Sequence, residues 1–520
     1  MNKPRLVYYN DAHHFHAKRI EPPASIYKLQ HPVDEVAATG VDVLVLGLGY
    51  ADVYFHNSKV GRVVGQKKEV WKNYIDWRIM RMVQEAHRMG TDQLREVIKR
   101  GRKVGVKVFP SLKLQDSAAP ESERCGLLKL EHGADVCVGQ SEERPWSYDF
   151  ANELVRQDKL AILREVLVDY EADGIELDFI FGGAFFKQTE VERHTPLMNR
   201  FVGQIREMAN EIGREQGREI PIMARVHDNN MDNLALGLHV DTWLKARHID
   251  FVVAQVSAML FETEKVDGWL ADSANAVGAT AYYRPPRRIY DERTIFPSVE
   301  MYRALSQTLK WQGFGGMYLG YLPWPFSDRE YQILREVGYP EIHARRNKRY
   351  VLQPRELGGS YKPQPQRQLP HELEEEKTAS FSILVADDLE SAKKDGELRK
   401  PILTIRFSYF CIEDDVEIRL NGKVLPRDEA EIDDERGLQI PANYPGEVDA
   451  PLGFSAHWFR YKVNVDDIKR GENTLEIEVR KFAKTAGFTR SVNGVEIQTR
   501  YKDFVRPEGL KVDRMSPLSA

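Results

Sequence analysis

The stretch DGIELDFI, residues 173–180, alternates apolar and acidic side chains. A period of two is typical of a β-strand, in which the apolar residues face one side and Glu176 and Asp178 face the other. Segments with the period of an amphipathic helix lie before and after it, at 151–171 and 196–216. The stretch is therefore predicted to be one strand in a repeating pattern of strands and helices.

The same pattern extends over residues 1–340. Seven further strand-like runs are LVYYN (6–10), VDVLVLGL (41–48), VKVFPSL (106–112), IPIMARVH (220–227), IDFVVAQVS (249–257), VGATAYY (277–283) and FGGMYLGYL (314–322). Further helix-like segments lie at 76–88, 92–103, 298–312 and 328–337. Eight strand and helix units predict a (β/α)₈ TIM barrel in the α/β class. An open doubly wound sheet would carry a glycine-rich phosphate turn after its first strand, and none follows residue 10.

The pattern changes after Pro340. Prolines exclude regular structure from much of residues 341–378, which are predicted to be a linker or a strap. Residues 379–520 contain short alternating segments and a hairpin signal at Asn421-Gly422, which together predict a C-terminal all-β jelly-roll sandwich. The runs EIRLNGKVL and WFRYKVNVDDIKRGENTLEIEV resemble the galactose-binding-like domains of many glycosidases. Such a domain either binds sugar or only buttresses the barrel, and the sequence leaves both alternatives open.

Composition excludes several functional classes. The 520 residues include 74 basic and 79 acidic side chains, so no global field favours nucleic acid or an anionic membrane. Three cysteines without metal-ligand spacing predict neither a disulfide framework nor a zinc site. No secretory signal is recognisable at the N-terminus, so we expect a cytoplasmic protein or a trimmed secreted or periplasmic one.

Enzymes with this fold carry their chemistry at the C-terminal ends of the strands. Glu176 and Asp178 are therefore predicted to point into the lumen. Two carboxyl groups close together in such a place have pKa values that differ from each other. Asp178, nearer the rim, is the predicted nucleophile or base, and Glu176 is predicted to orient it or to pair with Arg225. The candidates for a second catalytic acid are Asp228 and Glu262. The alternative is a buried ionic cluster that only fills the barrel.

The other strand ends carry aromatic, amide and guanidinium groups, which suit a hydroxyl-rich ring. The residues predicted to bind substrate are Asn10, Asp11, His14, Arg225, His227, Gln255, Tyr282, Arg284, Tyr321 and Trp324.

Arg284, Arg287 and Arg288 lie in a proline-stiffened loop after the seventh strand. Because guanidinium groups match carboxylate and sulfate oxygens, these residues favour an anionic sugar, a uronate or a sulfated one. The alternative is that they pair with Asp291 and Glu292.

The early histidines require a test for metal binding. His14 and His16 have the spacing of the metal-binding HxH motif of amidohydrolases, and His227 would fit the same scheme. Gln255 stands where that scheme needs a histidine, and the fourth strand has no bridging lysine. The sequence therefore predicts no metal and no cofactor, and a metal-dependent hydrolase remains an alternative.

Several stretches resemble a group of glycosyl-hydrolase-like barrel proteins from environmental bacteria. They are NDAHHFH (10–16), GVDVLVLGLGYADVYFHNSKVG (40–61), DGIELDF (173–179) and LGLHVDTWLKARHIDFVV (236–253). The resemblance implies a barrel and a carbohydrate substrate. The fourth strand also resembles that of the chitinase family, but Ile180 stands where that family has an acid. The predicted function is a glycoside hydrolase acting by paired carboxylates, and the missing acid favours a non-catalytic carbohydrate-binding barrel as the alternative.

Overall fold

The computed structural model describes residues 3–66, 70–256, 260–264, 266, 268–289, 296–354, 368–433 and 456–502. They form two compact units: residues up to 289 with 308–340, and 296–307 with the described residues from 341 onward. No helix among the described residues is both long and apolar enough to cross a membrane.

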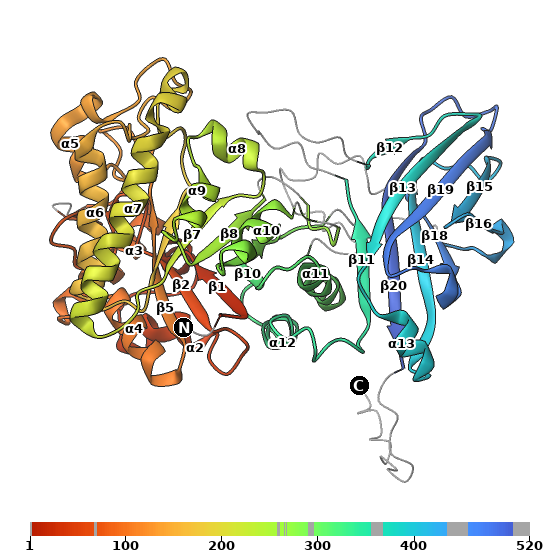
Figure 1. Ribbon diagram of the computed structural model, residues 1–520, viewed down its shortest axis with the longest axis horizontal. Coiled ribbons are helices and arrows are strands. Elements are labelled where there is room, and N and C mark those ends of the chain that lie inside the picture. Colours follow the sequence, from red (N-terminus) through yellow and green to blue (C-terminus); the bar gives the residue numbers. More distant parts are fainter. Residues whose placement is uncertain are drawn as a thin grey trace, which may run out of the picture. The chain divides into compact units, whose positions relative to one another are not determined.

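The first unit contains a closed barrel of eight parallel strands, which confirms the predicted TIM barrel (Figure 1). Each predicted strand segment overlaps one observed strand, because each is an apolar run bounded by polar or glycine residues. The barrel strands are β1 (Leu6–Asn10), β2 (Val43–Gly47), β5 (Lys107–Lys113), β6 (Ile175–Asp178), β7 (Ile222–His227), β8 (Phe251–Gln255), β9 (Thr280–Arg284) and β10 (Gly316–Gly320). Pairing of β10 with β1 closes the barrel.

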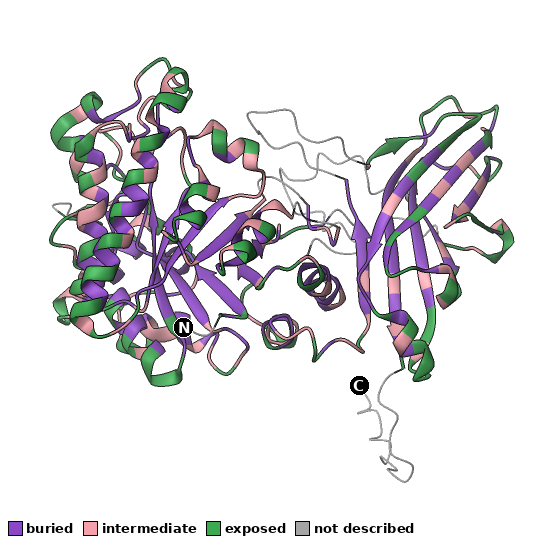
Figure 2. Cartoon of the chain, viewed as in Figure 1, coloured by how far each residue is buried: buried purple, intermediate pink, exposed green. Residues whose placement is uncertain are grey.

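Most helices around these strands are buried on one side and exposed on the other (Figure 2). Side-chain caps begin several of them; for example, Asp92 caps α4 and Asn152 caps α6. The helices of this unit are α1 (Ala12–Lys18), α2 (Ile26–Asp34), α3 (Tyr74–Arg88), α4 (Gln93–Val104), α5 (Leu127–His132), α6 (Glu153–Val168), α7 (Val191–Gln216), α8 (Asn230–Ala235), α9 (Val240–Lys245), α10 (Trp269–Ala276) and α12 (Asp328–Glu336). Helix α11 (Val299–Trp311) begins in the second unit, and its residues up to 309 are not exposed. A short pair, β3 (Val53–Tyr54) with β4 (Arg62–Val63), lies outside the barrel sheet.

Alternate residues of the strands fill the lumen with a continuous apolar cluster that includes Phe109, Phe251, Tyr282 and Tyr318. The Tyr282 hydroxyl donates a hydrogen bond of 2.6 Å to the carbonyl of Pro4, just before β1. Tyr282 therefore points toward the N-terminal end of the barrel. The polar side chains at the opposite, C-terminal end, here called the mouth, lie above this apolar floor.

The second unit is built from two antiparallel sheets, as the sequence predicted. The first has the order β11 (Lys348–Leu352), β20 (Ser491–Tyr501), β14 (Leu398–Ser408), β18 (Ala456–Lys462) and β17 (Glu431–Asp433), with β12 (His371–Glu372) also paired to β20. The second has the order β13 (Lys377–Val385), β19 (Gly471–Lys481), β15 (Asp415–Leu420) and β16 (Lys423–Leu425). Asn421 and Gly422 both have positive φ, 52° and 82°, as a two-residue hairpin requires.

One segment predicted as linker forms part of this unit. Residues 348–352 pair with β20 as the edge strand β11, and Pro354 follows without interrupting a ladder. The ammonium group of Lys348 is buried and lies 3.0 Å from Asp387 Oδ1. Lys348 therefore belongs to a buried ion pair. The alternation of apolar and polar residues in the sequence cannot reveal such a pair.

The buried histidine His16 gives the barrel unit a dependence on pH. Its Nε2 lies 2.8 Å from Gln93 Oε1, and burial lowers its pKa to about 4. Between its unfolded pKa of about 6.5 and pH 4, only the unfolded state binds this proton, so stability falls as the pH falls, by roughly 3 kcal/mol. We expect His16→Met to flatten the plot of unfolding free energy against pH in this window, measured by urea denaturation. His132→Met, at an exposed position of α5, is the control, and equal slopes for wild type and His16→Met would contradict the prediction.

Candidate active site

Asp178 ends β6 and is almost completely buried. Its Oδ1 accepts hydrogen bonds from the backbone N–H groups of Ile180 and Phe181, at 2.9 and 3.3 Å. Its Oδ2 accepts a hydrogen bond of 2.5 Å from Nη2 of Arg225 on the neighbouring strand β7. The carboxylate is therefore fixed in position by its own loop and by one guanidinium group.

Glu176 lies one residue pair deeper on the same strand and is fully buried. Its Oε1 accepts a hydrogen bond of 2.7 Å from the Ser111 hydroxyl and lies 3.5 Å from Arg225 Nη2, which is the predicted pairing. Its Oε2 accepts no hydrogen bond of ordinary geometry from a described residue. Burial raises the pKa of Glu176, and the attraction of Arg225 does not cancel this effect.

Arg225 is enclosed by aromatic rings as well as carboxylates. Its guanidinium lies 4.5 Å from the centre of the Tyr9 ring and 5.5 Å from that of Tyr318. Burial opposes its charge, but Asp178 and Glu176 outweigh burial and hold the pKa of Arg225 well above its ordinary value. Arg225 is therefore a permanent buried cation.

Arg284, at the end of β9, adds a second guanidinium group to the cluster at the mouth. It donates a hydrogen bond to Gln255 Oε1, which also accepts one of 3.3 Å from Arg225. Its guanidinium lies 5.7 Å from the Tyr9 ring centre and 5.6 Å from that of Tyr321, and it forms no ion pair with a described residue. Burial and the nearby Arg225 lower the pKa of Arg284, so a bound anion would relieve an existing electrostatic cost.

Lys113, at the end of β5, adds a third cation. It is 7% exposed and is the register partner of Asp178. Its Nζ lies 3.8 Å from Asp11 Oδ2 and 4.4 Å from the Phe181 ring centre, and it donates no hydrogen bond to a described residue. A buried ammonium group with unused donors can serve a ligand at the mouth.

Asp11 follows β1 and caps helix α1. Its Oδ1 accepts from the backbone N–H of His13 at 3.0 Å, and its Oδ2 accepts from the Tyr321 hydroxyl at 2.8 Å. The Nδ1 of His14 lies 3.1 Å from the same Oδ2. Although burial opposes ionisation, His14, Lys113 and Tyr321 together hold the pKa of Asp11 well below its usual range.

Tyr321 has a left-handed backbone, with φ of 56°. This conformation is unusual for a bulky residue and costs about 1–3 kcal/mol. It follows β10 directly and places the ring against His14, Tyr9 and the guanidinium of Arg287, at centroid distances of 5.4, 5.7 and 4.9 Å. The strained residue thus contacts residues of or after both neighbouring strands, β1 and β9.

The structure does not bring all predicted residues to this cluster. Tyr282 lies in the apolar floor, and Trp324 packs on the guanidinium of Arg19, 5.5 Å from its ring centre. Burial lowers the pKa of His227 at the end of β7, where Asn233 hydrogen-bonds its backbone.

Other predicted residues also occupy strand ends. Asn10 ends β1, and its buried Oδ1 has no hydrogen-bond partner among the described residues. Asp228 and Glu262 are half-buried after β7 and β8. Asp291 and Glu292, the predicted partners of the loop arginines, lie outside the described residues.

Three groups near the mouth could in principle ligate a metal. Ligand atoms of Asp11, His13 and His14 lie within 4.8 Å of one another. However, His14 is within hydrogen-bonding distance of Asp11, and the cation of Lys113 lies beside the same oxygen. His16 is buried on Gln93, so the HxH arrangement is not assembled. This donor set fits a hydrogen-bonded cluster better than a dication site.

Lys113 and Tyr318 were not among the residues that the sequence predicted for the site. Lys113 falls one residue beyond the predicted end of its strand at 112. Continued alternation from Phe109 through Ser111 would have placed its side chain in the lumen beside Asp178.

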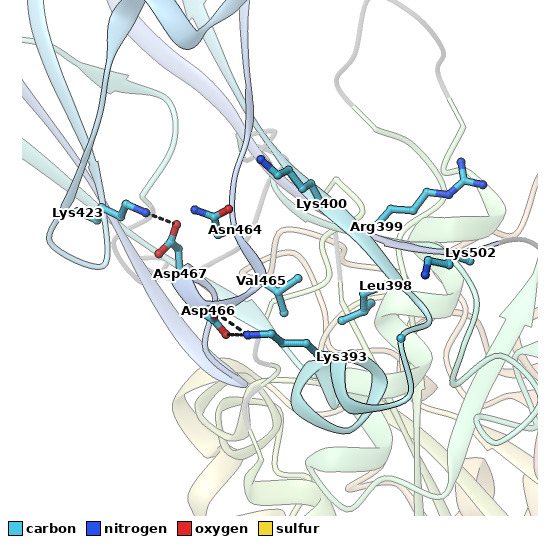
Figure 3. A pocket seen from close by; sticks show the side chains of 11 residues that line it. Lys393, Leu398, Arg399, Lys400, Lys423, Asn464, Val465, Asp466, Asp467 and Lys502 are labelled. Carbon is cyan, nitrogen blue, oxygen red and sulfur yellow. Dashed lines mark hydrogen bonds and ion pairs between the residues drawn. The ribbon is translucent and has the colours of Figure 1, made fainter.

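The second unit contains a hollow of about 540 Å³ (Figure 3). Lys393 contacts both carboxylate oxygens of Asp466, and Lys423 lies 2.8 Å from Asp467 Oδ2. The described residues that line the hollow include no aromatic ring for stacking on a sugar.

No protein-family model matches the sequence, and no curated protein matches it. Solved structures similar to the chain include a cycloisomaltooligosaccharide glucanotransferase from a Paenibacillus species, with 9% identity and a TM-score of 0.34 over 95% of this chain and 57% of that one. A maltogenic α-amylase from Thermotoga neapolitana has 10% identity and a TM-score of 0.37, over 92% and 99% of the two chains. A GH36 α-galactosidase from Geobacillus stearothermophilus has 11% identity and a TM-score of 0.39, over 96% and 56%. The chain spans little more than half of the first and third, and the likeness to glycoside hydrolases of several families is distant and concerns the fold alone.

Removing Arg225 should destabilise the barrel. Arg225→Met leaves Asp178 and Glu176 buried without their shared cation, which we expect to lower the free energy of unfolding by about 3–5 kcal/mol. Arg287→Met removes an exposed arginine from the same mouth and should change it by less than about 0.5 kcal/mol. Urea denaturation of both variants tests this, and equal losses would show that the ion pairs add no stability.

Proposed function

We propose that this chain is a glycoside hydrolase that holds an anionic sugar, a uronate or a sulfated one, at the mouth of its barrel. The observation that carries the proposal is the position of Asp178, a fixed carboxylate at the rim, among two tyrosine rings and two further cations. Tyr321, which is half-buried, offers ring surface, and Arg284 and Lys113 offer positive charge. Together these groups match a ring with both C–H faces and an acidic substituent.

Asp178 keeps the capacity to react despite its hydrogen bonds. A carboxylate has about four lone-pair sites, and the described contacts use two on Oδ1 and one on Oδ2. The remaining lone pair belongs to Oδ2, the oxygen that Arg225 holds in position. Asp178 is therefore proposed as the nucleophile or base, with Glu176 below it as a positioning residue. Protonation of the leaving oxygen needs a second group, for which the sequence offered Asp228 and Glu262.

The first test is hydrolysis. We expect Asp178→Asn to reduce turnover of a wild-type substrate, found in a library of neutral and anionic glycosides, by at least about a thousandfold. Because the new amide group faces Arg225, far-ultraviolet circular dichroism must show that the variant is folded. Asp466→Asn in the second unit is a matched control and should keep full turnover. Binding of glycans without any hydrolysis by the wild type would favour the carbohydrate-binding alternative.

The second test concerns substrate charge. Arg284→Ala removes the cation that lacks an ion-pair partner, so we expect the KM for glucuronides to rise about tenfold while that for the matched glucosides changes little. The effect should shrink at high salt, because screening weakens the attraction that is lost. Arg335→Ala on α12 removes an arginine that lies over Tyr331 and is the control. Equal changes for neutral and charged substrates would contradict the anionic assignment.

A further inference from the structure

His14 combines a buried partner with an accessible ring. Its side chain is 45% exposed, whereas the Asp11 carboxylate beside it is 6% exposed. Asp11 cannot turn away freely, because its Oδ1 holds the His13 N–H and its Oδ2 holds the Tyr321 hydroxyl. The carboxylate is thus a fixed support, and the imidazole is the part that reaches the mouth.

The contact with Asp11 also determines which ring nitrogen is available. In the neutral ring, the Nδ1–H donates to the carboxylate, which leaves Nε2 as the atom that gives or takes a proton. No described residue forms a hydrogen bond with Nε2. Nearby, the His13 ring packs on Tyr50 instead, at 4.4 Å between centroids, and burial lowers its pKa to about 3.

His14 and Asp178 line the same mouth, because two series of contacts connect them. The Tyr321 ring contacts both His14 and Tyr9, and Tyr9 lies under the Arg225 guanidinium that holds Asp178. On the other side, Lys113 lies beside Asp11 and is the register partner of Asp178.

We infer that His14, positioned by Asp11, is the proton-transfer group of this site, in place of a second carboxylate. The inference rests on the proposed hydrolase function. In the first step, the protonated ring gives its Nε2 proton to the glycosidic oxygen as the C1–O bond breaks and its electron pair stays on that oxygen. An Asp178 oxygen supplies the pair for the new bond to C1. In the second step, Nε2 takes a proton from water as the water oxygen bonds to C1, and Asp178 leaves as a carboxylate.

The kinetic test uses the dependence on leaving group. Wild type and His14→Gln are compared on α- and β-glucuronides and glucosides of 2,4-dinitrophenol, which leaves without protonation, and of phenol, which needs it. We expect His14→Gln to lose about a hundredfold or more in kcat/KM on the phenyl substrates and less than about threefold in the first step on the dinitrophenyl ones. Asp11→Asn should show the same selectivity to a smaller degree, and His13→Gln should show none.

A second measurement determines which ring nitrogen of His14 carries the proton. Long-range proton–nitrogen correlation spectra of the ¹⁵N-histidine-labelled chain should show neutral His14 protonated on Nδ1, and Asp11→Asn should remove this preference. Protonation on Nε2, or equal kinetic losses on both leaving groups, would overturn the role of His14 while hydrolysis by the wild type still stood. Absence of hydrolysis of every glycoside by the wild type would overturn the hydrolase function and this role together.

Discussion

The pairing of Arg225 with Asp178 and Glu176 is the interaction on which the mouth depends. One guanidinium group faces two carboxyl groups in a region that excludes water. A single positive charge cannot neutralise two negative ones. Burial and the nearby Asp178 raise the pKa of Glu176, and Arg225 opposes this effect. Both carboxyl groups therefore depend on the same guanidinium, and its removal would leave them buried without a cation.

This arrangement also explains why the other cations remain available. Arg225 contacts the carboxyl groups of β6, and the partners of Arg284 among the described residues are the amide oxygen of Gln255 and aromatic ring faces. Lys113 shares Asp11 with His14 and Tyr321 and lies at 3.8 Å from it. Among the described residues, Arg284 therefore makes no ion pair with a carboxylate, and Lys113 makes only a long one. Cations in this position favour a ligand that brings negative charge with it.

The sequence predicts the barrel well because each strand is an apolar run and each main helix has its own period. The same period of two places Glu176 and Asp178 on one face, and the register sets Arg225 beside Asp178, from where its Nη2 also lies 3.5 Å from Glu176 Oε1. Tyr282 shows where this reasoning stops. The stagger of barrel strands decides the layer in which a side chain lies, and here it places Tyr282 beside Val253 in the floor, with Arg284 above it beside Gln255. That stagger is a property of the closed sheet, so it cannot be predicted from the sequence of a single strand.

The strained backbone of Tyr321 depends on the same closure. Strands β10 and β1 are neighbours, and Tyr321 follows the last residue of β10 while Asp11 follows the last residue of β1. A left-handed residue at this point turns the side chain across the seam, where its hydroxyl meets Asp11 and its ring meets Tyr9. An extended backbone would carry the chain onward and lose this contact. The strain is therefore offset by a hydrogen bond to a charged group and by aromatic packing, and it fixes the carboxylate against which His14 rests.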